Sequence, residues 1–238
     1  MLDHEPSMSR RLFNSPDYPT IPTSEDGLYP VHRIFCVGRN YVEHSREMGV
    51  EVDREAPFYF LKDAQAIVPT GSAIPYPPGT DNFHYEMELV IAVGTQVFRA
   101  SESQAAAAIW GYGCGLDMTR RDLQLAARAK QRPWDLGKNF EKSAVMAALT
   151  PAAAVGTVGP QRITLKVNET LRQDAYLSDL VWSPVEIVVH LSQYYHLAPG
   201  DLIYTGTPAG VGPVVAGDRI HGEIDGLAPV DLTVGGAE

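Results

Sequence analysis

The sequence contains few cysteines: only Cys36 and Cys114 occur in 238 residues. Two cysteines are too few for the disulfide framework that holds many small secreted domains together. A chain of this length can bury enough apolar surface to fold without such cross-links. Both cysteines lie in apolar, strand-like segments. We therefore expect them to be reduced core residues in a reducing compartment.

Basic residues are also scarce, with 19 Lys and Arg against 29 Asp and Glu, a formal net charge of −10. This balance argues against nucleic acid and anionic membranes as partners. An acidic substrate would need a local cluster of Arg and Lys, because the overall field repels it.

Long hydrophobic runs are missing as well. No apolar run has the roughly 20 residues that cross a bilayer. The N-terminal segment lacks the apolar stretch of a secretory signal, and its Asp3 and Glu5 argue against a transit peptide. We expect a cytoplasmic protein that acts on a small molecule.

The chain has no internal repeat, no interdomain linker and no regular alternation of strands with helices. Residues 1–30 are rich in Pro, Ser and Asp and are predicted to form an extended N-terminal arm, followed by one catalytic domain at 31–238. Strand patterns outnumber helical ones. This favours an α+β fold with a mixed sheet curled around a core.

The apolar patterns give the expected elements. Strands are predicted at 31–38, 57–63, 84–94, 111–119, 161–169, 173–182, 201–206, 218–224 and 229–234. Helices are predicted at 41–49, after Ser101 as far as Gly111, at 119–131 with Thr119 and Asp122 as a capping pair, and after Ser183 with Pro184 and Glu186 completing a capping box. The proline-rich segment 67–83 is predicted to be a loop.

Two acids, Glu86 and Glu88, stand one residue apart in the predicted strand HYEMELVIAVG. Residues i and i+2 of a strand face the same side, and His84 shares that side. The two carboxylates repel each other unless a cation or protons lie between them. Most such pairs belong to a solvated strand face, and a metal site is the alternative.

A third acid, Asp117, favours the metal site. It follows the apolar segment GYGCGL, where a strand would run into a turn. Three carboxylates at strand ends form an oxygen-only ligand set suited to Mg²⁺ or Mn²⁺, with Ca²⁺ as a further candidate. About three coordination positions would remain for water or substrate. We place His84 beside the metal rather than on it.

A candidate base comes from the predicted helix 41–49. His44 and Glu47 lie three residues apart and share a face of that helix. A solvated surface pair is one interpretation. In the other, Glu47 orients the imidazole, and the free ring nitrogen takes a proton from water.

The cations Arg39, Lys62, Arg121 and Lys138 stand near glycines or strand ends. Each alone is typical of a surface residue, whereas a substrate with two carboxylates would need several of them. The late segment YTGTPAGVGPV is either a tight turn or a backbone cradle with the Thr207 hydroxyl facing a ligand carboxylate. Its glycine spacing fits neither a Walker loop nor a dinucleotide-binding fingerprint.

In this order, the segments resemble the fumarylacetoacetate hydrolase family, and most of all the acylpyruvate-cleaving branch that acts on fumarylpyruvate in aromatic-acid degradation. The matching segments are GRNYVEHSREMG, FLKD, HYEMELVIAVG, GYGCGLDMTRRDLQ, WDLGKNF, VNETLRQ and DLIYTGTPAGVGPV. The resemblance covers roughly residues 31–225. It implies a mixed β-roll, a homodimer and a divalent metal.

The resemblance also implies roles for single residues. Glu86, Glu88 and Asp117 match the metal ligands, His44 and Glu47 the water-activating pair, and Lys138 the lysine that neutralises an oxyanion. Gln124 and Thr207 match substrate contacts, and Arg39, Lys62 and Arg121 are further expected to bind substrate. Relatives often have Pro where this chain has Asp63, which adds a negative charge beside Lys62.

The implied activity is metal-dependent hydrolysis of a carbon–carbon bond in an acylpyruvate, a 2,4-diketo acid. Two rivals use the same scaffold: decarboxylation of oxaloacetate, which needs no attacking water, and isomerisation of an unsaturated dicarboxylate. A rival of another class is a non-catalytic carboxylate-binding module, which needs no base. The His44–Glu47 pair favours hydrolysis over all three.

Overall fold

The computed structural model describes residues 13–14, 16–47 and 56–237. Its largest element is an eight-stranded mixed sheet in which β15 pairs with β3, and β11 with β5, in parallel, while the other pairs are antiparallel. In spatial order the strands are β4 (Phe58–Lys62), β3 (Arg33–Gly38), β15 (Asp201–Tyr204), β8 (Met87–Val93), β9 (Ile109–Asp117), β11 (Ala144–Met146) and β5 (Ile67–Pro69), with β12 (Thr150–Pro151) on β9.

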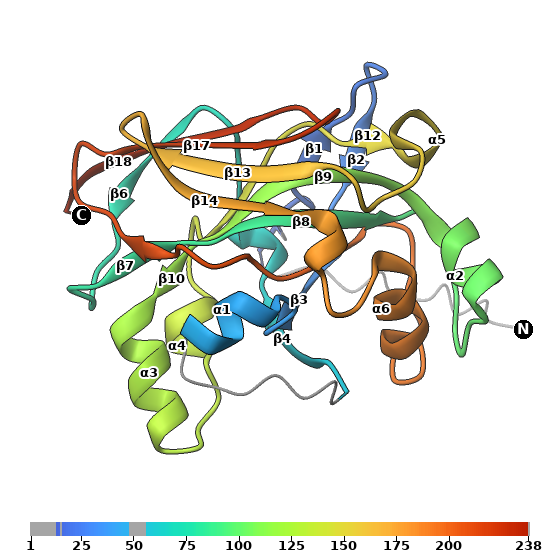
Figure 1. The fold of residues 1–238 in the computed structure, drawn as a ribbon, viewed down its shortest axis with the longest axis horizontal. Coiled ribbons are helices and arrows are strands. Elements are labelled where there is room, and N and C mark those ends of the chain that lie inside the picture. The colour runs from blue at the N-terminus through green and yellow to red at the C-terminus, as the bar shows by residue number, and fades with distance from the viewer. Residues whose placement is uncertain (1–12, 15, 48–55, 238) are drawn as a thin grey trace, which may run out of the picture.

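A five-stranded sheet packs over β8 and β9 (Figure 1). Its order is β14 (Thr170–Tyr176), β13 (Arg162–Val167), β17 (Arg219–Ile224), β18 (Val230–Ala237) and β6 (Ser72–Tyr76). Smaller pairings join β10 (Thr119–Arg120), β7 (Phe83–Tyr85) and β16 (Gly212–Pro213), and the hairpin of β1 (Thr20–Pro22) with β2 (Leu28–Pro30).

The helices are short: α1 (Val42–Glu47), α2 (Glu102–Ala108), α3 (Arg121–Ala129), α4 (Asp135–Lys138), α5 (Ala152–Val155) and α6 (Pro184–Leu191). Two single-turn 3₁₀ helices occupy Ala64–Ala66 and Leu177–Asp179. In Figure 1, α1, α3 and α4 gather below β8, on the side away from the five-stranded sheet. In the described ranges, no helix is long and apolar enough to cross a bilayer.

Strand β8 is the centre of the core, and all seven of its residues are buried. Leu89 and Ile91 belong to the apolar cluster shared with the five-stranded sheet, whereas Val90 and Ala92 pack with β3 and β15 on the other face. A strand covered on both faces is expected to be apolar throughout. The fold class inferred from the sequence, a mixed sheet-rich α+β fold, is therefore confirmed.

Several predicted elements are wrong in detail. The segment 67–83 is no continuous loop, because it contains β5, β6 and β7. Strands β5 and β6 each lie at the edge of a sheet, where one side has no partner strand and proline is tolerated. Likewise, Gly111 does not end a helix: α2 ends at Ala108, and Gly111 lies inside β9.

The predicted strand 84–94 is interrupted at Glu86. Its first part, β7, pairs with β10 and β16, and its second part, β8, belongs to the large sheet. The predicted strand 173–182 is also displaced, since β14 ends at Tyr176 and a 3₁₀ turn follows.

One of the two predicted helix caps is present in the structure and the other is not. The predicted box at Ser183 and Glu186 is present, with both reciprocal bonds. The predicted pair at Thr119 and Asp122 is absent, because Asp122 instead accepts hydrogen bonds from Thr80 and from the backbone N–H of Asp81. The side chain of Asp122, which the local pattern predicted to cap the helix, therefore forms its hydrogen bonds with residues distant in the sequence.

Candidate active site

Three buried carboxylates meet where β8 and β9 lie side by side. Glu86 precedes β8, Glu88 lies within it, and Asp117 ends β9. The Asp117 backbone N–H donates to the Glu86 carbonyl, 2.9 Å away, which sets the two residues opposite each other. One oxygen from each of the three side chains lies within 4.8 Å of the others. The pairing of β8 with β9 thus brings Asp117 to the two glutamates.

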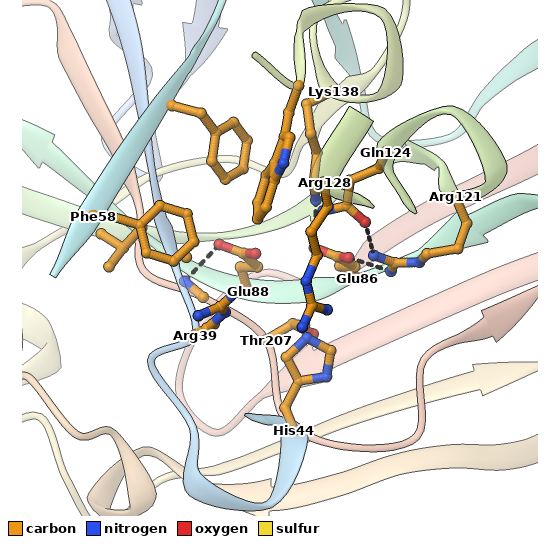
Figure 2. Close-up of a pocket in the computed structure, with 15 residues that line it drawn as sticks. Arg39, His44, Phe58, Glu86, Glu88, Arg121, Gln124, Arg128, Lys138 and Thr207 are labelled. Atoms are coloured by element: carbon orange, nitrogen blue, oxygen red, sulfur yellow. Dashed lines mark hydrogen bonds and ion pairs between the residues drawn. The ribbon is translucent and has the colours of Figure 1, made fainter. Parts of the chain in front are cut away.

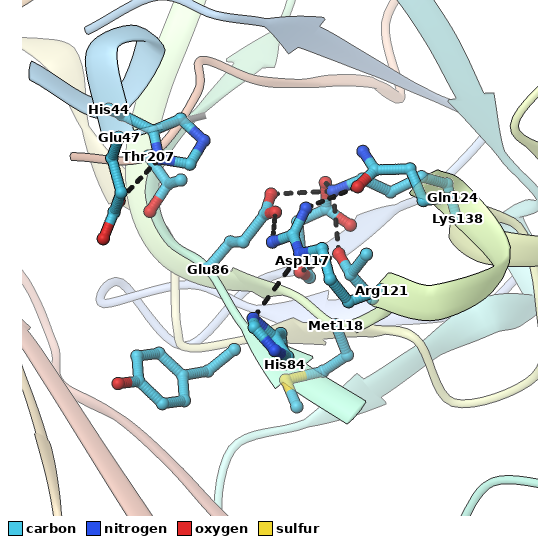
Figure 3. A network of polar contacts seen from close by, with 12 residues as sticks. His44, Glu47, His84, Glu86, Asp117, Met118, Arg121, Gln124, Lys138 and Thr207 are labelled. Carbon is cyan, nitrogen blue, oxygen red and sulfur yellow. Dashed lines mark hydrogen bonds and ion pairs between the residues drawn. The ribbon is translucent and has the colours of Figure 1, made fainter. Parts of the chain in front are cut away.

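Three buried cations surround the carboxylates, and Figure 3 shows Arg121 and Lys138 beside Glu86 and Asp117. Lys138 Nζ, at the end of α4, lies 2.7 Å from Glu86 Oε2 and 2.7 Å from Asp117 Oδ2. Arg121, the first residue of α3, pairs with the other oxygen of Glu86, and Lys62 Nζ lies 2.8 Å from Asp117 Oδ1. Three cations thus balance three acids. A buried charge without such a partner would be costly.

The cations nevertheless stabilise the ionised form of Glu86 much more than that of Glu88. Burial raises the pKa of Glu86, but Lys138 and Arg121 outweigh it, so the pKa lies well below its usual range. Burial likewise lowers the pKa of Lys138, and Asp117 and Glu86 overcome this and raise it. The pKa of Glu88 is raised far above its usual range, first by burial and then by Asp117 and Glu86. Glu88 is therefore the position where another positive charge is most favourable.

The site has the ligand chemistry of a divalent cation. Within the described residues, Asp117 Oδ1 is buried and accepts no hydrogen bond, although it forms an ion pair with the Lys62 ammonium 2.8 Å away. A buried acceptor without a donor is costly. This oxygen, together with those of Glu86 and Glu88, gives the oxygen-only set that Mg²⁺ and Mn²⁺ prefer. The residues fit such an ion.

His44 faces the carboxylates from α1. It is buried, with 7% of its surface exposed, and its Nδ1 lies 3.3 Å from Glu47 Oε2. Figure 3 shows the imidazole turned toward Glu86, with Glu47 behind it. Burial lowers the pKa of His44, and the opposing effect of Glu86 is smaller. The ring is therefore neutral near pH 7, as a general base must be.

The glycine-rich segment after β15 holds the carboxylates of Glu88 and Glu47 in place. The Gly206 N–H donates to Glu88 Oε2 at 2.7 Å, and the Gly210 N–H lies 3.2 Å from both carboxylate oxygens of Glu47. Gly206 has φ +96° and Gly210 φ +97°, a region that other residues rarely adopt. A Cβ on Gly210 would also lie 2.0 Å from the Arg172 carbonyl oxygen. The backbone of this segment thus binds carboxylates. They are the side chains of Glu47 and Glu88 and not those of a ligand.

Glu86 and Glu88 open onto a small pocket of about 40 Å³. Its polar lining includes Arg39, His44, Arg121, Gln124, Arg128, Lys138 and Thr207, and its apolar wall contains Phe58, Phe60 and Trp134 (Figure 2). Arg39 has φ +58°, a strained conformation for a residue with a Cβ, as is often found at binding sites. The cations of the pocket suit an anionic ligand, and the aromatic wall suits a flat carbon chain.

Lys62, which was predicted to bind substrate, and His84 do not line the pocket. Lys62 lies behind Asp117 and has no solvent-exposed side-chain surface. His84 lies behind Arg121, whose Nε is 3.4 Å from His84 Nδ1, while His84 Nε2 contacts Asn82 Oδ1 at 2.8 Å. Burial and then Arg121 lower the pKa of His84 to about 4. His84 is thus neutral and lies near Arg121 and Glu86.

Sequence reasoning missed three residues of the site. Arg128 lines the pocket from α3, seven residues after Arg121, and that helical spacing was the available signal. Thr119 Oγ1 lies 2.8 Å from Lys138 Nζ. Gln173 reaches Thr207 from a distant strand, and local sequence carries no sign of that contact.

Comparisons with known proteins agree with this geometry. Residues 33–235 match the fumarylacetoacetate (FAA) hydrolase C-terminal family. The chain belongs to the fumarylacetoacetate hydrolase family. It is therefore an enzyme, and the resemblance inferred from the sequence segments is confirmed.

Individual relatives are also similar over most of their length. The chain is 53% identical to a fumarylpyruvate hydrolase of Ralstonia sp. over 193 residues, 80% of this chain and all of the relative. It is 40% identical to the mitochondrial oxaloacetate tautomerase FAHD1 of Homo sapiens, over 84% of this chain and 90% of the relative. The crystal structure of fumarylpyruvate hydrolase from Pseudomonas aeruginosa in complex with Mn²⁺ and pyruvate is 44% identical and superimposes with a TM-score of 0.92, covering 95% of this chain and all of that one.

Proposed function

We propose that the protein hydrolyses a carbon–carbon bond in an acylpyruvate, with fumarylpyruvate as substrate and fumarate and pyruvate as products. The observation that carries this proposal is a neutral, buried His44 that is backed by Glu47 and faces Glu86 across the pocket. The similarity to fumarylpyruvate hydrolases supports it. The homodimer, the cytoplasmic location and a place in aromatic-acid degradation stay predictions.

Glu86, Glu88 and Asp117 would hold a divalent cation, Mg²⁺ or Mn²⁺. When bound, that ion supplies Lewis acidity for the 2-oxo acid end of the substrate. Arg121 keeps Glu86 ionised and in place, and Gly206 fixes Glu88. These contacts hold the ligand oxygens in position before the ion arrives.

His44 would act as the general base. Glu47 accepts the hydrogen on Nδ1, which leaves Nε2 free to take a proton from a water molecule. The water oxygen forms a bond to the distal keto carbon, and the bond between that carbon and the methylene group breaks. The electron pair stays with the pyruvate fragment, and a proton on its methylene carbon completes the products. Atoms balance as acylpyruvate plus water giving a carboxylic acid and pyruvate.

Lys138 is the candidate for stabilising the negative charge on the attacked carbonyl oxygen. Its ammonium now donates to Glu86, Asp117 and Thr119. These contacts keep it protonated and aimed at the carboxylates. A fixed charge of this kind lowers a barrier by roughly 3–4 kcal/mol. Lys62, by contrast, would act on Asp117 alone and touch no substrate.

Tautomerisation of a 2-oxo acid is the second candidate. It is favoured by the 40% identity to the oxaloacetate tautomerase and needs a base but no attack of water on carbon. The aromatic wall and the further arginines suit a longer, flat carbon chain than that of oxaloacetate, which favours the hydrolase.

A substrate panel separates these candidates. Purified protein with Mn²⁺ is given fumarylpyruvate, acetylpyruvate or oxaloacetate, and released pyruvate is measured together with the keto–enol ratio. We expect stoichiometric pyruvate from fumarylpyruvate. Pyruvate from oxaloacetate alone would indicate a decarboxylase, and a changed keto–enol ratio without pyruvate a tautomerase.

A further inference from the structure

Gln173 is an exception within its own strand. Strand β14 lies at the edge of the five-stranded sheet, and most of its side chains are exposed, yet Gln173 is completely buried. It belongs to the VNETLRQ segment, to which the mechanism above gives no role. Burying an amide is costly unless its polar atoms are hydrogen-bonded. The partners of Gln173 therefore show what it does.

Those partners lie in the active site. Gln173 Oε1 accepts from the backbone N–H of Met87 at 3.1 Å, between Glu86 and Glu88. Its Nε2 donates to the Pro208 carbonyl oxygen and to Thr207 Oγ1, both at 2.8 Å.

These partners fix the orientation of the amide. A backbone N–H only donates and a carbonyl oxygen only accepts, so the two ends of the Gln173 amide cannot be exchanged. Its second N–H must therefore point at the Thr207 hydroxyl oxygen.

This constraint determines which hydrogen bond the Thr207 hydroxyl accepts and which it can donate. The hydroxyl accepts from Gln173, so its own hydrogen has to find another acceptor. In the described part of the chain Thr207 Oγ1 makes no other hydrogen bond. Thr207 lines the pocket. Its hydrogen is therefore available to an oxygen of a ligand there.

The backbone of β14 is shaped to deliver Gln173 to this place. The register between β13 and β14 shifts at Leu165 and Lys166, so that Arg172 has no partner opposite it. Such a bulge redirects the following side chain. Gly210 packs directly on the bulge, since a Cβ there would meet the Arg172 carbonyl oxygen.

We propose that Gln173 is a positioning residue for substrate: it commits the Thr207 hydroxyl to donate to a carboxylate or keto oxygen of a 2-oxo acid in the pocket. It does so from outside the pocket and touches no substrate itself. This inference rests on the proposed function only in the class of ligand, a 2-oxo acid, and not in the bond that is cleaved.

The test replaces Gln173 by glutamate, which has the same shape. Its ionised form still accepts from Met87 but cannot donate, so the Thr207 hydroxyl turns toward it and away from the ligand. Binding of pyruvate to the Mn²⁺-loaded protein is measured by titration calorimetry for wild type, Q173E, T207V and Q173E/T207V. Q96E, at an exposed position, is the matched control.

We expect Q173E and T207V each to weaken pyruvate binding roughly 10- to 100-fold, the value of a hydrogen bond to a charged group. The double variant should bind no more weakly than T207V, because both changes remove the same bond. Mn²⁺ affinity without pyruvate should not fall. A protonated glutamic acid regains a donor, so the defect of Q173E should grow between about pH 5.5 and about pH 8.5.

Three results would overturn the inference: pyruvate binding of Q173E within about twofold of wild type, effects of Q173E and T207V that multiply, or no pyruvate binding by wild type. A parallel loss of Mn²⁺ affinity would show a merely structural role and overturn it too. If Q173E does not fold, Q173M is tested in the same cycle. If pyruvate binds as expected but no acylpyruvate is cleaved, the hydrolase proposal fails and this inference stands.

Discussion

Lys62 and Asp117 form an ion pair in the interior, with Nζ and Oδ1 2.8 Å apart and both side chains completely shielded from solvent. With Lys138 and Arg121 it completes a set of three cations around three carboxylates. The site therefore carries no excess of negative charge in the absence of a metal. A bound dication adds two positive charges, which a dianionic substrate would neutralise.

This balance predicts that metal and substrate bind cooperatively. We expect pyruvate or oxaloacetate to tighten Mn²⁺ binding about 10-fold or more, and Mn²⁺ to tighten binding of the acid by the same factor, as linkage requires. Calorimetric titrations in both orders measure the two factors. Uncharged pyruvamide serves as the control ligand. Equal Mn²⁺ affinity with and without the acid would contradict the charge argument.

Removing Lys62 should destabilise the metal-free protein. In K62M, Asp117 loses one of two cations, and breaking a buried pair costs about 3 kcal/mol of unfolding free energy. Saturating Mn²⁺ should restore part of this loss, because it supplies charge to the same carboxylate. Chemical unfolding with and without Mn²⁺ measures both effects, and K130M, at an exposed position, is the control. A K62M protein as stable as K130M would show that the pair contributes nothing.

Glu88 should be needed for metal binding but should not stabilise the metal-free protein. In E88Q the amide oxygen can keep the Gly206 hydrogen bond, and a neutral amide replaces a carboxyl group whose ionisation is disfavoured by burial. We expect the metal-free variant to melt no lower than wild type and to bind Mn²⁺ at least about 100-fold more weakly. E141Q, at an exposed position, should match wild type in both measurements. Strong Mn²⁺ binding by E88Q would remove Glu88 from the ligand set.

The raised pKa of Glu88 also gives metal binding a pH dependence. A proton held by Glu88 in the metal-free protein must leave when the cation binds, so Mn²⁺ affinity should rise with pH. Calorimetry in buffers of different ionisation enthalpy measures the proton released. Affinity that falls as pH rises would contradict this assignment.

His44 should set the acid limb of the pH–activity profile. The base works when neutral, so activity is lost as pH falls through its pKa, which burial holds below 6.5. Glu47 opposes that shift, so E47Q should move the limb to still lower pH and lower kcat roughly 10- to 100-fold. E43Q, an exposed residue of the same helix, is the control. A limb above pH 6.5, or one that E47Q moves upward, would exclude His44 as the base.

Much of the site could be predicted because it follows from local periodicity. Glu86, Glu88 and His84 were placed together by strand alternation, and His44 with Glu47 by helical spacing. Even the interruption of the strand at Glu86 did not separate the two glutamates, because the chain continues directly into β8.

The contacts that tune the site could not be predicted, because they join residues far apart in the sequence. Lys62 reaches Asp117 across 55 positions, and Gln173 reaches Thr207 across 34. The prolines of 67–83 misled for a related reason: whether proline is compatible with a strand depends on its place at the edge of the sheet, which only the assembled fold determines.

The central claim is that water activated by His44 cleaves the acylpyruvate. It is tested most directly by turning over fumarylpyruvate with Mn²⁺ in ¹⁸O-labelled water and analysing fumarate by mass spectrometry. We expect one labelled oxygen in each fumarate, released with equimolar pyruvate, and loss of both products in H44Q and in chelated protein. Unchanged turnover by H44Q, or conversion of the substrate without labelled fumarate, would contradict it.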